Sequence, residues 1–315
     1  MKFSKDTQVR PSLATDAHVL AEALPWIKEA TGKTVVIKYG GSAMEDPVLR
    51  AQVMSDIVLL RIIGVNPVLV HGGGKSINRA FERYGIPIEF KDGLRVTTDD
   101  AMDVVRTVLV GDVNQNLVRD INEHGNLAVG VSGSDAGTIV ATQLAPEYGR
   151  VGRITKVNVE YLNNLIEDGY IPVVAGIALG SHGGYYNINA DIAASAIAGA
   201  IHAHKFIALT DVDGLYLDFN DKTTLISNIT RDESRKMIDE GAIDTGMIPK
   251  LKSCVAALDA GVGRAHIVNG KTRHSLLLEL LTDTGIGTVI HGTTESYNAD
   301  QHPLSSVASK LMINQ

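Results

Sequence analysis

The chain has 315 residues, 44% of them hydrophobic and 21% charged, which suits one large α/β domain or two smaller lobes around a substantial core. It contains no apolar run of about 18 residues and no charged-then-apolar leader, so we expect a cytoplasmic protein that neither spans a membrane nor is exported. A net charge of −7 without any Lys/Arg-rich stretch argues against general affinity for nucleic acids. The single cysteine, Cys254, excludes an internal disulfide, and its amphipathic surroundings KLKSCVAALDAG indicate a packing role.

The first predicted element is a helix at residues 15–30, where apolar side chains recur at helical spacing. Residues 1–15 before it have a mixed polar composition and are expected to fray. Pro25 should kink this helix or divide it in two. The helix precedes the first strand, and the pattern leaves open whether its apolar face packs on its own domain or against another subunit.

Short apolar runs and helical patterns then alternate, which predicts an α/β fold with a mainly parallel sheet and crossover helices. Strands are expected at 34–39, 67–71, 127–131, 138–144, 171–177, 207–217, 264–268 and 287–290, with 138–144 as part of a hairpin. Helices are expected at 47–63, 75–84, 98–123, 157–168, from 190, and at 231–240, 250–260 and 272–281. No low-complexity linker separates the halves, so the boundary is placed at the glycine-rich turn within residues 172–184.

Two early strands end in glycines. The run VVIKYGGS at 35–42 delivers Lys38 and then two glycines, and VLVHGGGKS at 68–76 ends in three. Glycines at the carboxyl end of a strand let backbone N–H groups approach an anion without an intervening side chain. Neither run is a P-loop or a GxGxxG motif, and one glycine cluster alone is more often a tight turn. Two in succession, with a lysine beside the first, predict a phosphate-handling enzyme.

The second half of the chain contains three further segments with charged candidate residues. The segment TDVDGLY at 210–216 follows an apolar run, at the edge where open α/β sheets bind ligands. Lys250 begins a helix, an unfavourable place for a cation unless it faces an anion, so it joins Lys38 as a candidate phosphate ligand. Asp191 follows NIN at another helix start, where it either caps the helix or takes part in chemistry, with Asn187 and Asn189 supplying amide groups.

Two residues of the first half are also ambiguous. Arg95, in KDGLRVTT, is either a solvated loop residue or a forked clamp on a substrate carboxylate. His71, beside the triple glycine, is interpreted as a strand-end packing residue. The ten histidines include no HxxxH or HExxH spacing, so neither a tightly held zinc ion nor nucleophilic catalysis by the protein is indicated.

Six motifs in this order closely resemble the amino acid kinase family from about residue 34 to the end of the chain. They are KYGGS (38–42), HGGGKSIN (71–78), DGLRVT (92–97), NINADIAA (187–194), TDVDGLY (210–216) and DTGMIPKL (244–251). The resemblance implies a three-layer αβα sandwich. It also implies a tail and oligomerisation helix at 1–33, an N-acetylglutamate-binding lobe at 34–180 and an ATP-binding lobe with an arginine site at 181–315.

The activity implied by the resemblance is ATP-dependent phosphorylation of the side-chain carboxylate of N-acetyl-L-glutamate in arginine biosynthesis, with Mg²⁺ held mainly by the nucleotide phosphates. Lys38 and Lys250 would stabilise the transferring phosphoryl group, and Asp191 would orient both lysines. Gly41 and Gly73 would donate hydrogen bonds from their backbone N–H groups to the transferring phosphoryl group. The substrate would be held by Gly73, Gly74, Arg95 and Asn187, and the nucleotide by Asp211, Gly214, Tyr216, Gly246 and Met247. An acceptor carboxylate with an ordinary pKa of about 4.3 is ionised at neutral pH and needs no general base.

Feedback inhibition by L-arginine is a second implication of the resemblance. Arginine-inhibited members have an added helix where residues 15–30 lie, and an arginine site resembled here by Trp26, Lys205, His266, Glu279 and Gly285. Trp26 stands where we expect tyrosine, and Glu279 is either a solvent-facing helix residue or a carboxylate for a cationic ligand. The resemblance also implies a hexamer, a trimer of dimers joined through the added helices, and leaves open the binding of a PII-type signalling protein.

Three other functions compete with this one. A kinase for another acid or for carbamate is disfavoured by the DGLRVT and NINAD motifs. A non-catalytic arginine sensor would be favoured by loss of Lys38, Lys250 or Asp191, but all three are present. A nicotinamide dehydrogenase is the weakest alternative, because the dinucleotide-binding fingerprint is absent.

Overall fold

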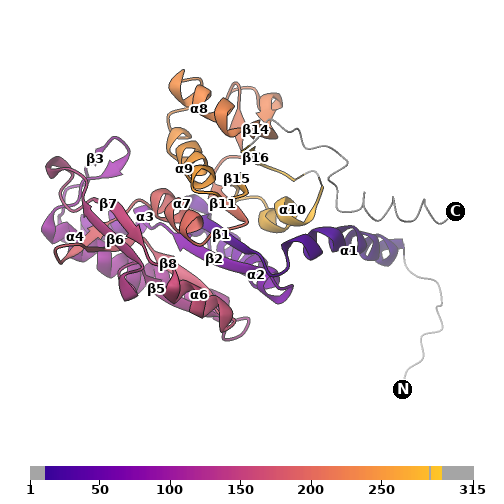
Figure 1. The fold of residues 1–315 in the computed structure, drawn as a ribbon, viewed down its shortest axis with the longest axis horizontal. Coiled ribbons are helices and arrows are strands. Elements are labelled where there is room, and N and C mark those ends of the chain that lie inside the picture. Colours follow the sequence, from indigo (N-terminus) through magenta and orange to yellow (C-terminus); the bar gives the residue numbers. More distant parts are fainter. Residues whose placement is uncertain (1–10, 284, 293–315) are drawn as a thin grey trace.

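A sheet of eight strands forms the centre of the molecule in the computed structural model, which describes residues 11–283 and 285–292. Every neighbouring pair in it is parallel except β15 and β16, which confirms the predicted mainly parallel sheet. In spatial order the strands are β14 (Asn228–Thr230), β16 (Thr288–His291), β15 (Arg264–Asn269), β11 (Lys205–Thr210), β1 (Thr34–Tyr39), β2 (Asn66–His71), β8 (Ile171–Ala175) and β5 (Ala128–Ser132). Strands β1 and β11 lie side by side, so one sheet runs through both halves of the chain (Figure 1).

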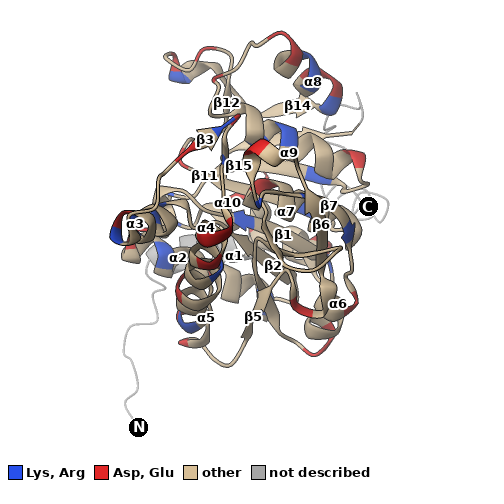
Figure 2. Ribbon diagram, turned by 90° about the vertical axis from the view of Figure 1, so that its left-hand side faces the viewer, with Lys and Arg blue, Asp and Glu red and all other residues tan. Residues whose placement is uncertain are grey.

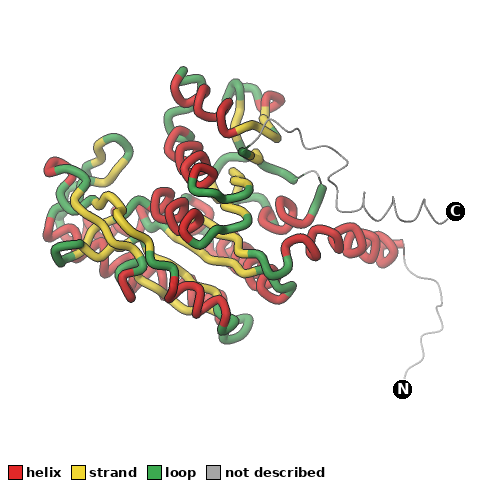
Figure 3. The backbone as a smooth tube through the Cα atoms, viewed as in Figure 1, coloured by secondary structure: helices red, strands yellow, loops and turns green. Residues whose placement is uncertain are grey.

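Helices cover both faces of this sheet, which confirms the three-layer αβα architecture (Figures 1 and 3). On one face lie α6 (Glu160–Glu167), α7 (Ala190–Ala200) and α9 (Ile248–Asp259). On the other lie α1 (Pro11–Ala30), α2 (Pro47–Ile62), α5 (Gln115–Asn122) and α10 (Ser275–Leu281). Successive residues of a strand point to opposite faces, so Val36 packs with the first group while Val35 and Ile37 pack with the second.

A second sheet of four strands lies beside the first half of the main sheet, in the order β10, β9, β6, β7. Its strands are β6 (Ile139–Gln143), β7 (Gly152–Val157), β9 (Ile177–Gly180) and β10 (Tyr185–Asn187). The single strand expected at 171–177 is therefore wrong, because the chain leaves the main sheet at Gly176. A Cβ at Gly176 would lie 2.6 Å from the carbonyl oxygen of Ile188, so this crossing needs glycine.

The helix expected at 98–123 consists of three consecutive segments. They are α4 (Asp99–Arg106), a π-helical segment η2 (Thr107–Asn114) and α5. The π-helical segment was not expected, since the apolar spacing does not distinguish it from an α-helix. It packs beside α3 (Gly74–Tyr84), which starts at the triple glycine.

Helix α1 differs from its prediction in where it begins and in the effect of Pro25. It begins at Pro11, so residues 11–15 are helical rather than frayed, and residues 1–10 lie outside the described residues. It also runs undivided through Pro25. Trp26 and Ala30, each 6% exposed, anchor its last turns on the second core cluster, and this packing offsets the hydrogen bond that proline removes. The rest of α1 projects from the body of the molecule (Figure 1).

Charged residues lie mainly on outer helices such as α3, α4, α6 and α8 (Arg231–Asp239), whereas the central strands are almost free of them (Figure 2). Of the helices in the described part of the chain, none combines the length and the apolar character needed to cross a membrane. Four short strands form two small hairpins over the carboxyl edge of the sheet, β3 (Phe90–Lys91) with β4 (Leu94–Arg95) and β12 (Leu215–Tyr216) with β13 (Leu225–Ile226).

Candidate functional site

The candidate site lies where β1, β2 and β11 end. These strands are parallel neighbours, so their carboxyl ends meet at one edge, the usual ligand-binding edge of such sheets. Two cavities of about 540 and 350 Å³ open there, and Lys38, Gly40 and Gly41 line both. The two cavities therefore share a wall that carries a lysine and a glycine pair.

Lys38 in the shared wall forms an ion pair with Asp191. Its Nζ lies 3.1 Å from Asp191 Oδ1, and the side chains are only 10% and 14% exposed. The interpretation of Asp191 as a helix cap is wrong, because Asn189 is the N-cap of α7 and its side chain accepts hydrogen bonds from the backbone N–H groups of Asp191 and Ile192. The cap leaves the Asp191 carboxylate free to face Lys38.

The glycine pair after β1 is held by Asp211, the first residue after β11. Ser42 donates to Asp211 Oδ1 from its backbone nitrogen and its hydroxyl, at 3.0 and 2.8 Å. Gly41 has a φ of +79°, and a Cβ there would lie 2.9 Å from both carboxylate oxygens of Asp211. This position therefore requires glycine.

Arg95 lies in the smaller cavity, and the interpretation as a solvated loop residue is wrong, because it is only 7% exposed. Its guanidinium carbon lies over the rings of Phe81 and Phe90, 5.2 and 4.7 Å from their centroids. Its Nη2 donates to the carbonyl of Gly74 at 3.2 Å and to Asn78 Oδ1 at 2.6 Å. These two bonds orient the guanidinium fork. Its buried Nη1 has no hydrogen-bond partner among the described residues, so its N–H donors are left for an anion.

His71 contacts the backbone of the triple glycine and is fully buried, as expected. Its Nδ1 lies 2.9 Å from the carbonyl oxygen of Gly72, so Nδ1 must carry the proton. Its Nε2 then accepts from Asn114 Nδ2 at 3.0 Å, and this amide also donates to the carbonyl of Val173 at 2.8 Å. Burial lowers the pKa of His71 to about 4, so the ring is neutral at physiological pH.

Helix segment η2 packs directly on the next glycine. A Cβ at Gly73 would lie 2.5 Å from Leu109 Cδ2 and 3.3 Å from Val113 Cγ2. Asn114, the last residue of the same segment, contacts His71. The unpredicted π-helical segment therefore supports the loop that the sequence singled out.

Acid should destabilise the fold through His71. The unfolded chain takes up a proton near pH 6.5 but the folded ring only near pH 4, so the free energy of unfolding falls as pH drops through this window. At pH 4.5 this loss amounts to about 2 kcal/mol relative to pH 7. We expect urea unfolding of the variant His71→Gln to lose less stability between these pH values than the wild type. The exposed His182→Gln is the control, and an equal pH response of all three proteins would contradict the prediction.

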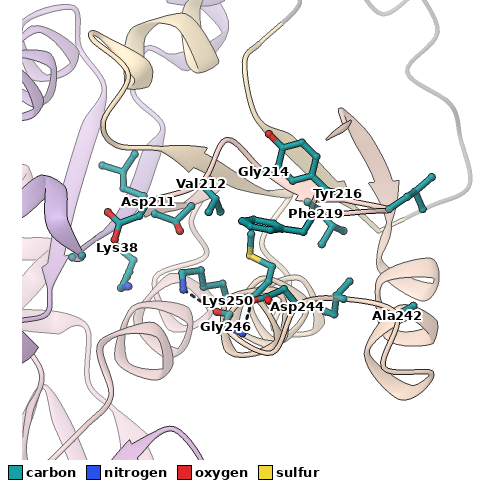
Figure 4. Close-up of a pocket in the computed structure, with 18 of the residues that line it drawn as sticks. Lys38, Asp211, Val212, Gly214, Tyr216, Phe219, Ala242, Asp244, Gly246 and Lys250 are labelled. Atoms are coloured by element: carbon teal, nitrogen blue, oxygen red, sulfur yellow. Dashed lines mark hydrogen bonds between the residues drawn. The ribbon is translucent and has the colours of Figure 1, made fainter. Parts of the chain in front are cut away.

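The larger cavity lies between the end of β11 and the start of α9 (Figure 4). Lys38 enters it from β1, and Lys250, the third residue of α9, enters from the other side and donates to the carbonyl of Gly246 at 3.0 Å. All the residues expected around a nucleotide line it, namely Asp211, Gly214, Tyr216, Gly246 and Met247. Phe219, Ala242 and Ile243 line it as well and were not predicted, because they lie in loops without a motif.

A third cavity, of about 160 Å³, lies apart from the sheet edge. The structure brings together in its wall all five residues of the expected arginine site, Trp26, Lys205, His266, Glu279 and Gly285. The interpretation of Glu279 as solvent-facing is wrong, because it is 5% exposed and accepts hydrogen bonds from His266 Nδ1 at 2.7 Å and from the backbone nitrogens of Ile286 and Gly287. Burial alone would raise the pKa of Glu279, but these hydrogen bonds outweigh it and hold the pKa below its usual value.

The neighbours of Glu279 are also buried. Burial lowers the pKa of His266 and of Lys205. His266 Nε2 has no hydrogen-bond partner among the described residues. Gly285 has a φ of +58°, and a Cβ there would lie 2.9 Å from Glu279 Oε2, so this position requires glycine.

Metal-binding side chains are not grouped in the described part of the chain, where no cluster of three or more His, Cys, Asp or Glu residues could hold an ion. Cys254 is buried in α9, as its pattern indicated, and burial raises the pKa of its thiol.

Comparison with known proteins gives one consistent result. Residues 33–269 match the model of the amino acid kinase family. The acetylglutamate kinase of Caldanaerobacter subterraneus subsp. tengcongensis is 50% identical over 276 residues, which cover 87% of this chain and 92% of that protein. The acetylglutamate kinase of a Nostoc species is 48% identical over 289 residues, covering 91% of this chain and 97% of the relative.

Solved structures show the same fold at lower identity. The N-acetylglutamate synthase of Neisseria gonorrhoeae, complexed with coenzyme A and N-acetyl-glutamate, superposes with a TM-score of 0.79 at 23% identity, covering 95% of this chain and 70% of that one. Carbamate kinase from Giardia lamblia bound to AMP-PNP gives a TM-score of 0.62 at 17% identity, covering 84% of this chain and all of that one.

Proposed function

The chain belongs to the amino acid kinase family, and we propose that this phosphotransferase moves the γ-phosphoryl group of ATP to the side-chain carboxylate of N-acetyl-L-glutamate. The product, N-acetyl-L-glutamyl 5-phosphate, would serve arginine biosynthesis. The observation that carries the proposal is the position of Lys38, which lines both cavities and is aimed by Asp191. A phosphoryl group passing from one cavity to the other would pass beside this cation.

The acceptor would occupy the smaller cavity. Arg95 supports this assignment with an oriented guanidinium suited to a carboxylate, and Asn187 lines the same cavity with an amide. Gly73 and Gly74 also line it, and their backbone can approach a ligand without intervening side chains. The acceptor carboxylate is ionised at neutral pH, so it can attack without a general base.

ATP would occupy the larger cavity, with its phosphates toward Lys38 and Lys250. Gly41 and Gly73 would donate backbone N–H groups to the transferring phosphoryl group. The chain's part in catalysis is then in-line placement and neutralisation of the charge on the phosphoryl oxygens. Mg²⁺, held mainly by the nucleotide phosphates, would supply further neutralisation when bound. The proposal divides the chain into an acceptor lobe at 34–180 and an ATP lobe at 181–315.

The test of the activity is ADP release from ATP and Mg²⁺ with N-acetyl-L-glutamate as acceptor. L-Glutamate, N-acetyl-L-aspartate and carbamate are the comparison acceptors. Turnover restricted to N-acetyl-L-glutamate supports the proposal. Faster turnover with another acceptor assigns the site to a different acid, and no turnover with any of them favours an arginine sensor that retains the kinase fold.

The third cavity would bind L-arginine as a feedback inhibitor. The buried Glu279 carboxylate supports this role as a partner for a cation, and the unpaired Nε2 of His266 supplies a hydrogen-bond acceptor. Helix α1 contributes Trp26 to this cavity and projects from the body, which supports its use in joining dimers into a hexamer.

The variant Glu279→Gln should weaken inhibition by L-arginine about 10- to 100-fold, the scale of losing a charged hydrogen-bond partner. The KM values for N-acetyl-L-glutamate and ATP should stay within about twofold, because the third cavity shares no lining residue with the other two. Inhibition curves measured with and without the substitution test this, and the exposed Glu167→Gln is the control. An unchanged half-inhibitory concentration would remove Glu279 from the arginine site.

A further inference from the structure

The hydroxyl of Thr97 joins the backbone of Arg95 to the side chain of Asn187, the two residues that would bind the acceptor. Its Oγ1 lies 2.9 Å from the carbonyl oxygen of Arg95, which can only accept, so the hydroxyl donates its proton there. The same oxygen accepts a hydrogen bond from Asn187 Nδ2 at 3.2 Å. Thr97 is completely buried, so this bridge is not exchanged for water. One hydroxyl therefore connects residues 95 and 187, which are far apart in the sequence.

The backbone around Thr97 holds this hydroxyl in place. Its backbone nitrogen donates to the carbonyl of Tyr148 at 3.1 Å, and its carbonyl accepts from the backbone nitrogen of Arg150 at 2.6 Å. The backbone carbonyl of Arg150 in turn accepts a hydrogen bond from the backbone nitrogen of Asn187 at 2.8 Å. A Cβ at Gly149, which has a φ of +63°, would lie 2.2 Å from the Thr97 carbonyl oxygen. Backbone hydrogen bonds thus link the segment around Thr97 to the loop at 148–151, and that loop to β10.

Thr97 does not line the smaller cavity, whereas Arg95 and Asn187 do. Its hydrogen bond uses one N–H of the Asn187 amide and so sets the plane of that amide, leaving the other N–H and the oxygen for a ligand. On the other side, it fixes the backbone of Arg95 while Gly74 and Asn78 fix the guanidinium. Thr97 can affect binding only through these two neighbours.

We propose that Thr97 is a positioning residue that sets the spacing between Arg95 and Asn187, and with it the fit of an N-acylated acidic amino acid. The inference rests on the proposed function, because it needs both side chains to contact the acceptor. The nucleotide occupies the other cavity, which Thr97 does not approach. The role predicts an effect on acceptor binding and none on ATP binding.

The experiment compares Thr97→Val, which keeps the size and removes the hydroxyl, with Thr97→Ser, which keeps the hydroxyl. Thr97→Val should raise the KM and the calorimetric Kd for N-acetyl-L-glutamate about tenfold, the scale of one lost hydrogen bond and a loosened partner. Its kcat at saturating acceptor and its KM for ATP should change less than about twofold, because the transition-state contacts of Lys38 are untouched. Thr97→Ser should restore most of the acceptor affinity.

A double-mutant cycle with Asn187→Ala separates positioning from general damage. If Thr97 acts through Asn187, its substitution by valine should raise the Kd less in the Asn187→Ala background than in the wild type. Additive effects, an unchanged Kd in Thr97→Val, or a Thr97→Ser variant as weak as Thr97→Val would overturn the inference. A shift in the KM for ATP as large as that for the acceptor would also overturn it, because it would indicate a general loss of structure.

The two proposals fail in different ways. If the wild type phosphorylates N-acetyl-L-glutamate and Thr97→Val binds it equally well, the positioning role is wrong and the function stands. If the wild type binds this acid without phosphorylating it, the function fails, while a weaker Kd of Thr97→Val still supports the role. If the wild type neither binds nor phosphorylates it, both proposals are wrong.

Discussion

Replacing Lys38 with alanine should lower kcat by at least about 100-fold, the scale of losing one preorganised stabiliser of transition-state charge. Lys38 lines both cavities, is buried, and is aimed by an ion pair with Asp191, so its ammonium group needs little reorganisation when the phosphoryl group moves. The KM values should change less than kcat, since the interaction is strongest in the transition state.

The measurement is single-turnover and steady-state ADP release by the purified variant, with thermal unfolding to show that it folds. Lys33→Ala, an exposed lysine just before β1, is the matched control and should be close to wild type. Lys38→Arg gives a second reading, because it keeps the charge but changes the reach. A folded Lys38→Ala enzyme with near-normal kcat would exclude Lys38 from the reaction.

Lys250→Ala should also lower kcat by about 100-fold or more, for a different physical reason. The positive end of the α9 dipole disfavours a lysine in the first turn, and within residues 11–283 and 285–292 its ammonium group has one hydrogen-bond partner, the Gly246 carbonyl at 3.0 Å. An anion in the larger cavity would relieve this repulsion, so Lys250 should also contribute to nucleotide binding. We therefore expect the KM for ATP to rise in Lys250→Ala, whereas in Lys38→Ala the fall in kcat should be the main effect.

The neighbouring variant Lys252→Ala provides the control, because Lys252 is exposed on the same helix and lines neither cavity. Kinetics with ATP varied at saturating N-acetyl-L-glutamate separate the two parameters. If Lys250→Ala and Lys252→Ala behave alike, Lys250 has no role in phosphoryl transfer. If Lys250→Ala is more stable and equally active, the lysine serves neither chemistry nor binding.

Much of the site could be predicted from the sequence, because the signals are local. A lysine and two glycines after one apolar run, three glycines after the next, and TDVDGLY after a third all lie at strand ends. Parallel strands bring such ends to one edge whatever the rest of the chain does, and β1, β2 and β11 are neighbours in the sheet. The predicted residues around Lys38 therefore line two adjoining cavities.

The ambiguous residues could not be assigned in this way. The sequence leaves Arg95 and Glu279 each as either a solvated residue or a ligand-binding one, and Asp191 as either a helix cap or a participant in chemistry, and all three are buried or nearly so. Asp191 depends on which residue caps α7, and that choice follows from the backbone angles at Asn189. Glu279 depends on the path of residues 285–287, whose backbone nitrogens bond it.

The π-helical segment and the second sheet are further tertiary results. Residues 107–114 have the apolar spacing of an α-helix, and only packing against Gly73 and His71 shows why Leu109 and Asn114 matter. The chain leaves the main sheet at Gly176, and this position needs glycine, because the Ile188 carbonyl approaches too closely for any other residue.

Periodicity, glycine runs and short motifs thus indicate the parallel sheet, the edge that carries the candidate site and the family, since each of these signals lies in residues close together in the chain. The tertiary structure alone establishes which carboxylate faces which cation, and which hydroxyl holds Arg95 and Asn187 together. These contacts join residues separated by about 90 to 150 positions, as for Thr97 with Asn187 and Lys38 with Asp191. Their distances follow from how the layers pack, and no local pattern contains that information.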